Sequence, residues 1–441
     1  MNTNQFPSAT TGTDFVSPAS RLSSIDALRG IAALGVVFYH AVHQTGGAVP
    51  DNFFRYPVRM IQFLASFGYI GVFLFFVISG FCIHLQWAKA RAAGQNHQIK
   101  FGAFWKRRLR RLYPPYLIAL VIFLGLTAVT AGIDVTHFFV YDVFMHVLML
   151  HNLDPQTCYS INGVFWTLAI EEQLYLAYFL LLFLRMRWGW GLTLIICALA
   201  RLAWFGFSHL IWLKTGIGVP VPEAAASHWF TWALGAFAVE AAFGLVKIPK
   251  WCRNISLGGI AVVLASIIST ALPNMQKDTP LHTLGWFLMH PLWGFGFFVV
   301  VNRFVHAEQS WGVISRPRLV AGFASIGVFS YSLYLTHELV IMQSWWFVFK
   351  DLPAMVNTFL VVTPATIIFA WLYYLFCEKP YMRNMRKQVS SSEFQVCSGE
   401  SPTSPQFPIS SPEFPVSHSG FTVGSSEFGV ATLSLKPESE L

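Results

Sequence analysis

The chain has 441 residues, of which 55% are hydrophobic and only 11% are charged. Soluble domains carry about 25% charged residues, so this composition excludes an ordinary soluble domain and predicts a polytopic membrane protein. The formal net charge of +8 does not indicate a nucleic-acid partner, because the basic residues lie in short loops between apolar segments, the pattern that orients helices in a bilayer. The six cysteines have neither metal-like nor redox spacing, so no metal site is expected.

Ten apolar segments are long enough to cross a bilayer, which takes about 20 residues of helix. They cover residues 25–45, 64–87, 112–131, 163–184, 189–212, 228–246, 255–272, 282–304, 324–347 and 356–377. A further apolar segment, 137–150, is too short to cross and is expected to form an interfacial or re-entrant helix. The predicted fold class is an all-α integral membrane protein, a bundle of about ten transmembrane helices.

Lysine and arginine residues indicate how this bundle is oriented. With ten spans and a cytoplasmic N-terminus, the inner segments hold 21 of these residues and the outer segments hold five. This asymmetry is the positive-inside signature. An eleventh crossing at 137–150 would move the later basic loops to the outside. Both termini are therefore predicted to be cytoplasmic.

The two ends of the chain differ in composition from the apolar segments. Residues 1–20 are polar, and the first apolar segment has no suitable cleavage site, so no cleavable signal peptide is expected. From residue 388 the chain is rich in Ser, Pro, Glu and Phe, with the loose repeats SSSEF, SSPEF and SSEF. Such a segment buries too little apolar surface to offset its chain entropy. We expect a disordered N-terminus (1–21), a membrane domain (22–387) and a disordered tail (388–441).

Ionisable residues within the spans are candidates for function, because each is costly in a bilayer unless it is paired or reaches water. In RGIAALGVVFYH, Arg29 and His40 are eleven residues apart, which covers roughly 16 Å and returns to nearly the same helix face. The alternative is a helix-end ion pair between Arg29 and Asp26. In TLAIEEQLY, the side chains of Glu171 and Glu172 point about 100° apart, so at most one shares a given partner; an interfacial pair with an arginine is the alternative.

Two more segments combine polar residues at helical spacing. The run FWKRRLRRLYPPY, before the third span, contains Lys106, Arg107, Arg108, Arg110 and Arg111. Arginines three residues apart share a helix face and suit bidentate contacts with phosphate, although most such clusters are topology signals or contact lipid headgroups. In FSYSLYLTHELV, His337 and Glu338 are either catalytic or form a hydrogen-bonded pair between helices.

The predicted orientation brings these groups into one column. The first span runs outward and places His40 in its outer half. The fourth span runs inward and places Glu171 and Glu172 at a similar depth. Arg29 then lies nearer the inner side, with the basic run beneath it. A long donor with a charged head and a reactive far end fits that order.

Five elements, in this order, resemble membrane acyltransferase family three, the bacterial O-acyltransferases that modify surface polysaccharides, peptidoglycan, nodulation factors and some macrolides. They are SIDALRGIAALGVVFYH, GYIGVFLFFVISGFCI, KRRLRRLYPPY, FWTLAIEEQLYL, and YSLYLTH with EKP at 378. The resemblance covers about residues 22–385. Many members have Ser where Thr167 stands and His where Phe165 stands, so neither position is counted as catalytic. Some members carry an extracytoplasmic hydrolase-like domain; here the membrane domain is expected to complete the reaction alone.

The resemblance implies that a multi-pass protein of the plasma (inner) membrane transfers an acyl group, most often acetyl, from cytoplasmic acyl-CoA to a hydroxyl, without a metal. His40 would take the hydroxyl proton, and Glu171 or Glu172 would orient its imidazole. Donor binding through charge-assisted hydrogen bonds is assigned to Arg29, Arg107, Arg108, Arg110 and Arg111. Ser79, in the SGF element, is expected to allow close helix packing rather than to act as a nucleophile.

The acceptor implied by the resemblance is a carbohydrate of the cell surface or an exported glycan, with a small natural product such as a macrolide as the alternative. Two other classes of protein stay open. Buried Arg, His and Glu residues also describe a proton-coupled transporter, although we find no internal repeat of the kind common in transporters. A membrane scaffold would act through the tail instead of through these residues.

Overall fold

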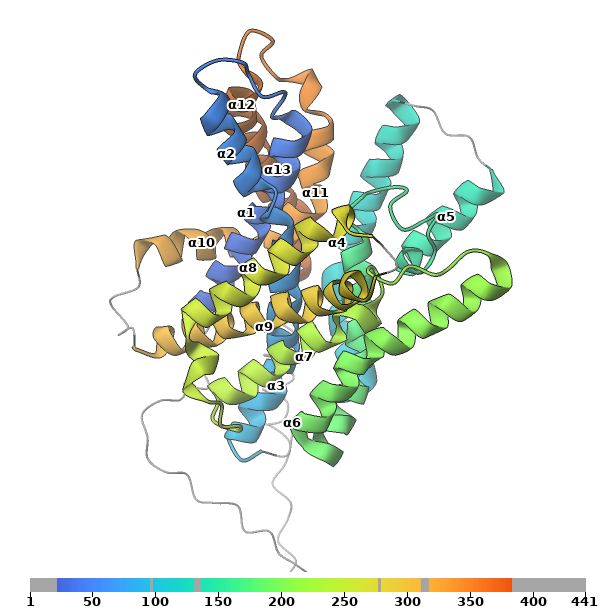
Figure 1. The fold of residues 1–441 in the computed structure, drawn as a ribbon, viewed down its shortest axis with the longest axis vertical. Coiled ribbons are helices and arrows are strands. Elements are labelled where there is room, and N and C mark those ends of the chain that lie inside the picture. The colour runs from blue at the N-terminus through green and yellow to red at the C-terminus, as the bar shows by residue number, and fades with distance from the viewer. Residues whose placement is uncertain (1–21, 96–97, 131–135, 277–278, 311–316, 383–441) are drawn as a thin grey trace, which may run out of the picture. The chain divides into compact units, whose positions relative to one another are not determined.

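The computed structural model describes residues 22–95, 98–130, 136–276, 279–310 and 317–382, all within one compact unit. This part of the chain is helical and contains no β-strand (Figure 1). Its α-helices are α1 (Ser23–Thr45), α2 (Arg55–Ala65), α3 (Gly71–Ala92), α4 (Phe101–Thr130), α5 (His137–Val147), α6 (Trp166–Thr215), α7 (Ala225–Ala242), α8 (Ile255–Ala271), α9 (Pro280–Ser310), α10 (Arg318–Val328), α11 (Ser330–Met342), α12 (Ala354–Asn357) and α13 (Thr363–Tyr373). Short 3₁₀ turns lie at Gly68–Ile70, His151–Leu153, Lys250–Arg253, Leu272–Asn274 and Ser344–Trp346, and π-helical turns at Thr358–Val362 and Tyr374–Glu378.

Within the described ranges, seven helical segments are long and apolar enough to cross a membrane, or eight if the bent pair α10 and α11 counts as one span. The protein is therefore an all-α, multi-pass membrane protein. The ten predicted spans lie largely on helical residues, but two of them share α6 and one is divided between α10 and α11. The count of ten and the cytoplasmic termini stay predictions. The expected disordered segments, 1–21 and 388–441, lie outside the described residues.

Two predicted spans, 163–184 and 189–212, fall on the single long helix α6. A break separates its halves at Gly189, where φ is 75° and ψ is 178°. Glycine adopts a positive φ without the steric cost that a Cβ imposes. Gly189 therefore allows the chain to turn between the two halves of α6 without a separate loop.

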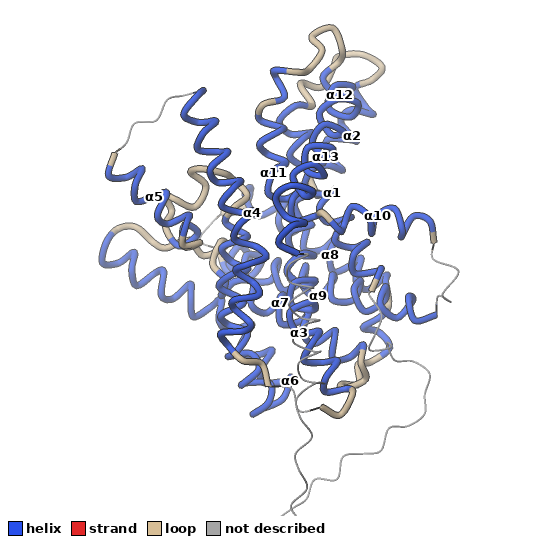
Figure 2. Tube along the Cα trace, turned by 180° about the vertical axis from the view of Figure 1, so that it is seen from behind, coloured by secondary structure: helices blue, strands red, loops and turns tan. Residues whose placement is uncertain are grey.

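The predicted span 324–347 is not one straight helix. It is divided between α10 and α11, which meet at an angle of 70°. Phe329 separates them, with φ −111° and ψ 20°, outside the geometry of a regular α-helix. The bend directs α11 along α1 and α13, and these three helices stand side by side in both views (Figure 1 and Figure 2).

The short apolar segment at 137–150 forms α5, which has 11 residues. At about 1.5 Å per residue, it is too short to cross a bilayer, as predicted. The side chain of Thr136 caps its first turn by accepting a hydrogen bond from the backbone N–H of Phe139. Tyr116 of α4 donates a hydrogen bond to the carbonyl of His146 at 2.9 Å and so fixes α5 against α4.

Small residues let the central helices approach closely, as in other membrane bundles. A methyl group at Gly80 of α3 would collide with the carbonyl oxygen of Trp232 in α7, and one at Gly235 of α7 would collide with that of Val77. The same holds where α1 crosses α10, since Gly327 lies against the backbone of Asp26. Glycine is thus required at the crossings that hold α1 and α3 in the bundle.

A closed charge network joins α3, α6 and α7. We use this name for His84, Tyr178, Arg185, Trp190 and Glu240. The Glu240 carboxylate, which has no exposed surface, accepts hydrogen bonds from His84 at 2.9 Å, from Nε and Nη2 of Arg185 at 2.8 and 2.7 Å, and from Trp190 at 2.9 Å. The other ring nitrogen of His84 lies 3.0 Å from the Tyr178 hydroxyl. Every charged group of this network is paired within the protein.

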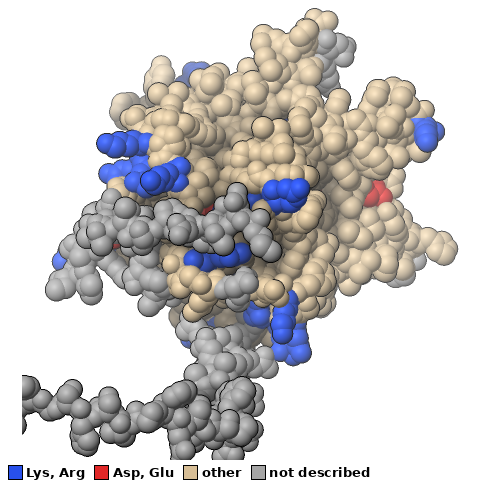
Figure 3. Space-filling model, turned by 90° about the horizontal axis from the view of Figure 1, so that it is seen from below, with Lys and Arg blue, Asp and Glu red and all other residues tan. Residues whose placement is uncertain are grey.

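The turn between α3 and α4 and the break in α6 lie at the same end of the bundle (Figure 1). Seen from that end, lysine and arginine side chains outnumber carboxylates on the surface (Figure 3). The turn between α1 and α2 lies at the opposite end. This arrangement agrees with the positive-inside pattern read from the loops.

Candidate active site

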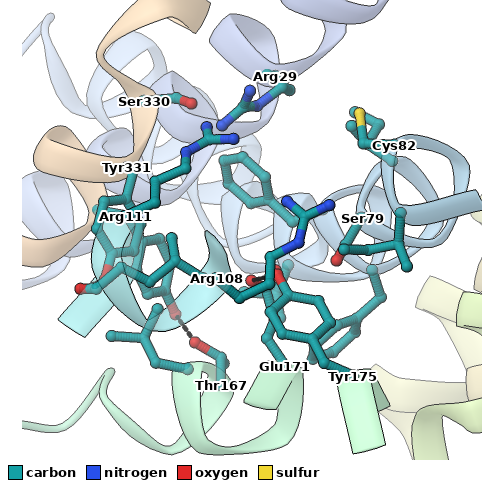
Figure 4. A pocket seen from close by; sticks show the side chains of 18 residues that line it. Arg29, Ser79, Cys82, Arg108, Arg111, Thr167, Glu171, Tyr175, Ser330 and Tyr331 are labelled. Atoms are coloured by element: carbon teal, nitrogen blue, oxygen red, sulfur yellow. Dashed lines mark hydrogen bonds between the residues drawn. The ribbon is translucent and has the colours of Figure 1, made fainter. Parts of the chain in front are cut away.

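A cavity of about 110 Å³ opens among α1, α3, α4, α6 and α11. Three arginines, Arg29, Arg108 and Arg111, line it, and Figure 4 shows their guanidinium groups directed into it from α1 and α4. Glu171 is the carboxylate among the lining residues. The polar side chains that complete the wall are Ser79, Cys82, Thr167, Tyr175, Ser330, Tyr331 and Tyr334. We call this the donor cavity, after the donor that the sequence predicts.

The donor cavity carries excess positive charge. Tyr175 donates a hydrogen bond to Glu171 at 2.9 Å, and among the described residues no ion pair joins Glu171 to an arginine of the cavity. The Nε atom of Arg111 is buried and has no partner in the described part of the chain. A cavity with three guanidinium groups and one carboxylate is suited to an anionic ligand, because Arg binds phosphate in bidentate fashion.

The basic run before α4 divides between the cavity and the surface. Arg108 and Arg111, three residues apart, line the cavity, as their shared helix face predicts. Arg107 and Arg110 do not line it. Each is rotated by about 100° from its cavity-lining neighbour, and Arg110 is exposed. The structure thus brings three of the five predicted donor-binding arginines together.

His40 lies beside a carboxylate, but not one that we expected. Its Nδ1 atom is 3.2 Å from Oε1 of Glu338 in α11, and its ring is 5.0 Å from the ring of His337. Glu171 instead lines the donor cavity. The predicted pairing of His40 with Glu171 or Glu172 is therefore wrong in its partner, because the bend before α11 brings Glu338 against α1.

The Glu338 carboxylate has a second neighbour besides His40. Gly163 lies against its carboxylate, since a Cβ built there would be 3.4 and 3.5 Å from the two oxygens. The Glu338 side chain is 8% exposed and that of His40 is 19% exposed. The pair is thus mostly buried, with the imidazole as its more accessible member.

Glu172 occupies different surroundings from Glu171, as their 100° separation predicts. Its side chain is buried, and both carboxylate oxygens lack a hydrogen-bond partner among the described residues. It lines neither the donor cavity nor the contact with His40. The catalytic role of Glu172 stays a prediction, and the structure shows no contact between this residue and His40 or the donor cavity.

Tyr334 connects the donor cavity to the His40–Glu338 pair. Its hydroxyl accepts a hydrogen bond from Thr167 at 2.7 Å (the dashed line in Figure 4) and donates one to the carbonyl of Val164 at 3.2 Å. Both Tyr334 and Thr167 line the cavity. Glu338 follows Tyr334 by four residues, about 6 Å along α11, so the cavity ends one helical turn from the pair.

The sequence offered Glu338 as a catalytic candidate together with His337, but it did not assign Glu338 as the partner of His40 and gave Tyr334 no role. The signal was present, because Tyr331, Tyr334 and Glu338 follow a three-plus-four spacing and so share one face of a helix. Thr167 was set aside because it departs from the serine of the family pattern. Its hydroxyl nevertheless lines the cavity and donates a hydrogen bond to Tyr334 there.

The fold and this site define a multi-pass membrane protein with a cation-lined cavity beside a histidine–carboxylate pair. The acyltransferase domain family matches residues 22–375. The match covers most of the chain, so the chain belongs to this family of acyl-transferring enzymes. The resemblance drawn from the sequence elements is confirmed.

Two relatives illustrate the similarity. The chain is 26% identical over 402 residues to the peptidoglycan O-acetyltransferase OatA of Listeria monocytogenes, a match that covers 82% of this chain and 56% of the relative. It is 25% identical over 378 residues to the O-acetyltransferase OatA of Staphylococcus aureus (strain NCTC 8325), covering 81% and 57%. The chain thus spans a little over half the length of these relatives. No solved structure matches the chain.

Proposed function

We propose that this membrane O-acyltransferase transfers an acetyl group from acetyl-CoA to a hydroxyl of a cell-surface or exported glycan at the plasma membrane. The observation that carries the proposal is the donor cavity with three arginines, which ends one helical turn from the His40–Glu338 pair. The names of the relatives support acetyl as the transferred group and a glycan as the acceptor.

The donor would bind through its phosphates. Arg29, Arg108 and Arg111 offer charge-assisted hydrogen bonds to phosphate oxygens, and the single carboxylate of the cavity leaves most of their charge uncompensated. The acyl end of the donor would then point toward Thr167 and Tyr334. The thioester carbonyl would thereby come close to the imidazole of His40.

Proton transfer is assigned to His40. Because its Nδ1 faces Glu338, its Nε2 is available to take the proton of the acceptor hydroxyl. The hydroxyl oxygen then forms the new bond to the thioester carbonyl carbon, and the carbon–sulfur bond breaks. The imidazolium, stabilised by the Glu338 carboxylate as in other histidine–carboxylate pairs, returns the proton to the departing thiolate.

The test is acetyl transfer by the full-length protein in lipid vesicles. Labelled acetyl-CoA is supplied with one of three acceptors: a peptidoglycan fragment, a neutral oligosaccharide or a macrolide. Label in an ester on either carbohydrate is the expected result. Label on the macrolide alone would contradict the glycan acceptor, and label on none of the acceptors under conditions in which acetyl-CoA binds would contradict the transferase.

A further inference from the structure

Arg201 is a buried cation outside the donor cavity. It lies in the second half of α6 and is only 3% exposed. Its Nη2 atom donates a hydrogen bond to the carbonyl of Trp286 at 2.8 Å, and its guanidinium lies 4.1 Å from the centre of the Trp286 ring. Its Nε and Nη1 atoms have no partner among the described residues. A buried guanidinium with two free donors is costly unless a ligand completes it.

The surroundings of Arg201 supply no negative charge. It borders a cavity of about 180 Å³ between α6, α7 and α9, and none of the lining residues is a carboxylate. The cavity is lined by Cys197, Ala198, Leu199, Arg201, Leu202, Ser227, Phe230, Phe287 and Pro291. Within the described part of the chain Arg201 forms no ion pair, and the ionisable side chains on which its charge acts, His228 and His290, are bases.

The first turn of α7 adds a second source of positive potential. Ser227 of that turn lines the cavity, and the amino-terminal end of a helix carries a partial positive charge. Hydrogen bonds fix the preceding loop against this turn and against α6. The Ser227 hydroxyl donates to the carbonyl of Val221 at 2.5 Å, and the Trp204 indole of α6 donates to the carbonyl of Pro220 at 2.9 Å. The guanidinium and the helix end therefore favour the same kind of ligand, an anion.

The cavity borders the apolar surface of the bundle. Leu199 and Leu202, two of its lining residues, are 50% and 46% exposed on α6. In a membrane these side chains meet acyl chains, so a ligand that enters beside them carries apolar tails. No residue of this cavity also lines the donor cavity.

We propose that the Arg201 cavity binds a membrane lipid through an anionic phosphate oxygen of its headgroup. The phosphate accepts hydrogen bonds from Nε and Nη1 of Arg201, and the acyl chains lie along Leu199 and Leu202. This lipid site is distinct from the donor cavity and does not depend on the acetyl donor. It gives the buried guanidinium the counter-charge that the described residues lack.

The test is a binding titration with the full-length protein in detergent, followed by native mass spectrometry and thermal unfolding. Three probes are compared: dioleoylphosphatidylglycerol, dioleoylglycerol with the same chains but no phosphate, and inorganic phosphate. Only the phospholipid is expected to bind in the micromolar range and to raise the unfolding temperature. Equal binding of dioleoylglycerol, or equal stabilisation by inorganic phosphate, would overturn the proposal.

Variants of α6 locate the site. Arg201→Gln is expected to weaken phosphatidylglycerol binding about tenfold or more, the effect of losing a charge-assisted hydrogen bond. Arg187→Gln, which changes an exposed arginine of the same helix, is the matched control and should bind as the wild type does. Wild-type affinity in Arg201→Gln would overturn the assignment.

A second variant covers the case in which Arg201→Gln does not fold. Leu202→Trp fills the exposed edge of the cavity and leaves Arg201 intact. It is expected to weaken phosphatidylglycerol binding without lowering the unfolding temperature of the lipid-free protein. Unchanged lipid affinity in Leu202→Trp would contradict the proposed place of the acyl chains.

Discussion

Two groups of buried charges in this bundle differ in how completely they are paired. In the closed charge network, the Glu240 carboxylate accepts four hydrogen bonds from His84, Arg185 and Trp190. In the donor cavity, three arginines face one carboxylate, and a nitrogen of Arg111 has no partner in the described ranges. The complete pairing of the closed charge network indicates a structural role, whereas the uncompensated positive charge of the donor cavity indicates a site for a ligand.

The largest expected effect is on the proton acceptor. His40→Ala should lower the rate of acetyl transfer by about 10² to 10⁴, the usual contribution of general acid–base catalysis. The unfolding temperature is measured alongside, because the change also leaves the mostly buried Glu338 carboxylate without its partner. Steady-state kinetics with labelled acetyl-CoA measure the rate.

His43→Ala is the matched control for this change. His43 follows His40 by one turn of α1 and is exposed. A His43→Ala rate close to that of the wild type isolates the effect to His40. Near wild-type transfer by His40→Ala would remove the imidazole from the mechanism.

A substitution in the closed charge network should lower the free energy of unfolding and should have no specific effect on acetyl transfer. Glu240→Ala leaves the imidazole of His84 and the guanidinium of Arg185 without their carboxylate, and breaking a buried pair typically costs about 3–5 kcal/mol. Denaturant unfolding in detergent measures this loss. Glu223→Ala removes a single hydrogen bond with the exposed Tyr159 hydroxyl and should lower the free energy of unfolding far less. Equal losses in the two variants would contradict the structural role of the network.

A smaller effect is expected on donor binding. Arg108→Gln and Arg111→Gln should each raise the KM for acetyl-CoA about tenfold, since each removes a charge-assisted hydrogen bond to phosphate. The maximal rate should fall less than the affinity. Initial rates at varied acetyl-CoA concentration separate the two quantities.

Arg107→Gln and Arg110→Gln give the smallest expected change. These residues belong to the same basic run but do not line the donor cavity. Their KM values for acetyl-CoA should stay within about twofold of the wild type, the scale of surface charge effects. A rise as large as that of Arg108→Gln would show that the run acts as a general basic patch.

The sequence was sufficient for the all-helical class and for part of the site. Hydropathy indicated where the apolar helices lie but did not settle how many cross the membrane, and a spacing of three residues placed Arg108 and Arg111 on one face. The partner of His40 could not be obtained this way, because it depends on the 70° bend at Phe329, which hydropathy does not record. If the ninth predicted span were straight, nothing would favour Glu338 over Glu171 as the partner of His40. The pairing depends on a contact between α1 and α11, which are far apart in the chain.

Single-turnover transfer from labelled acetyl-CoA shows which carboxylate serves His40. Glu338→Gln, Glu171→Gln and Glu172→Gln are measured side by side under saturating acetyl-CoA. We expect Glu338→Gln to slow the acetyl-transfer step at least about 100-fold, and the other two variants to stay within about tenfold of the wild type. Wild-type transfer by Glu338→Gln, together with a loss in Glu171→Gln or Glu172→Gln, would contradict the pairing of His40 with Glu338.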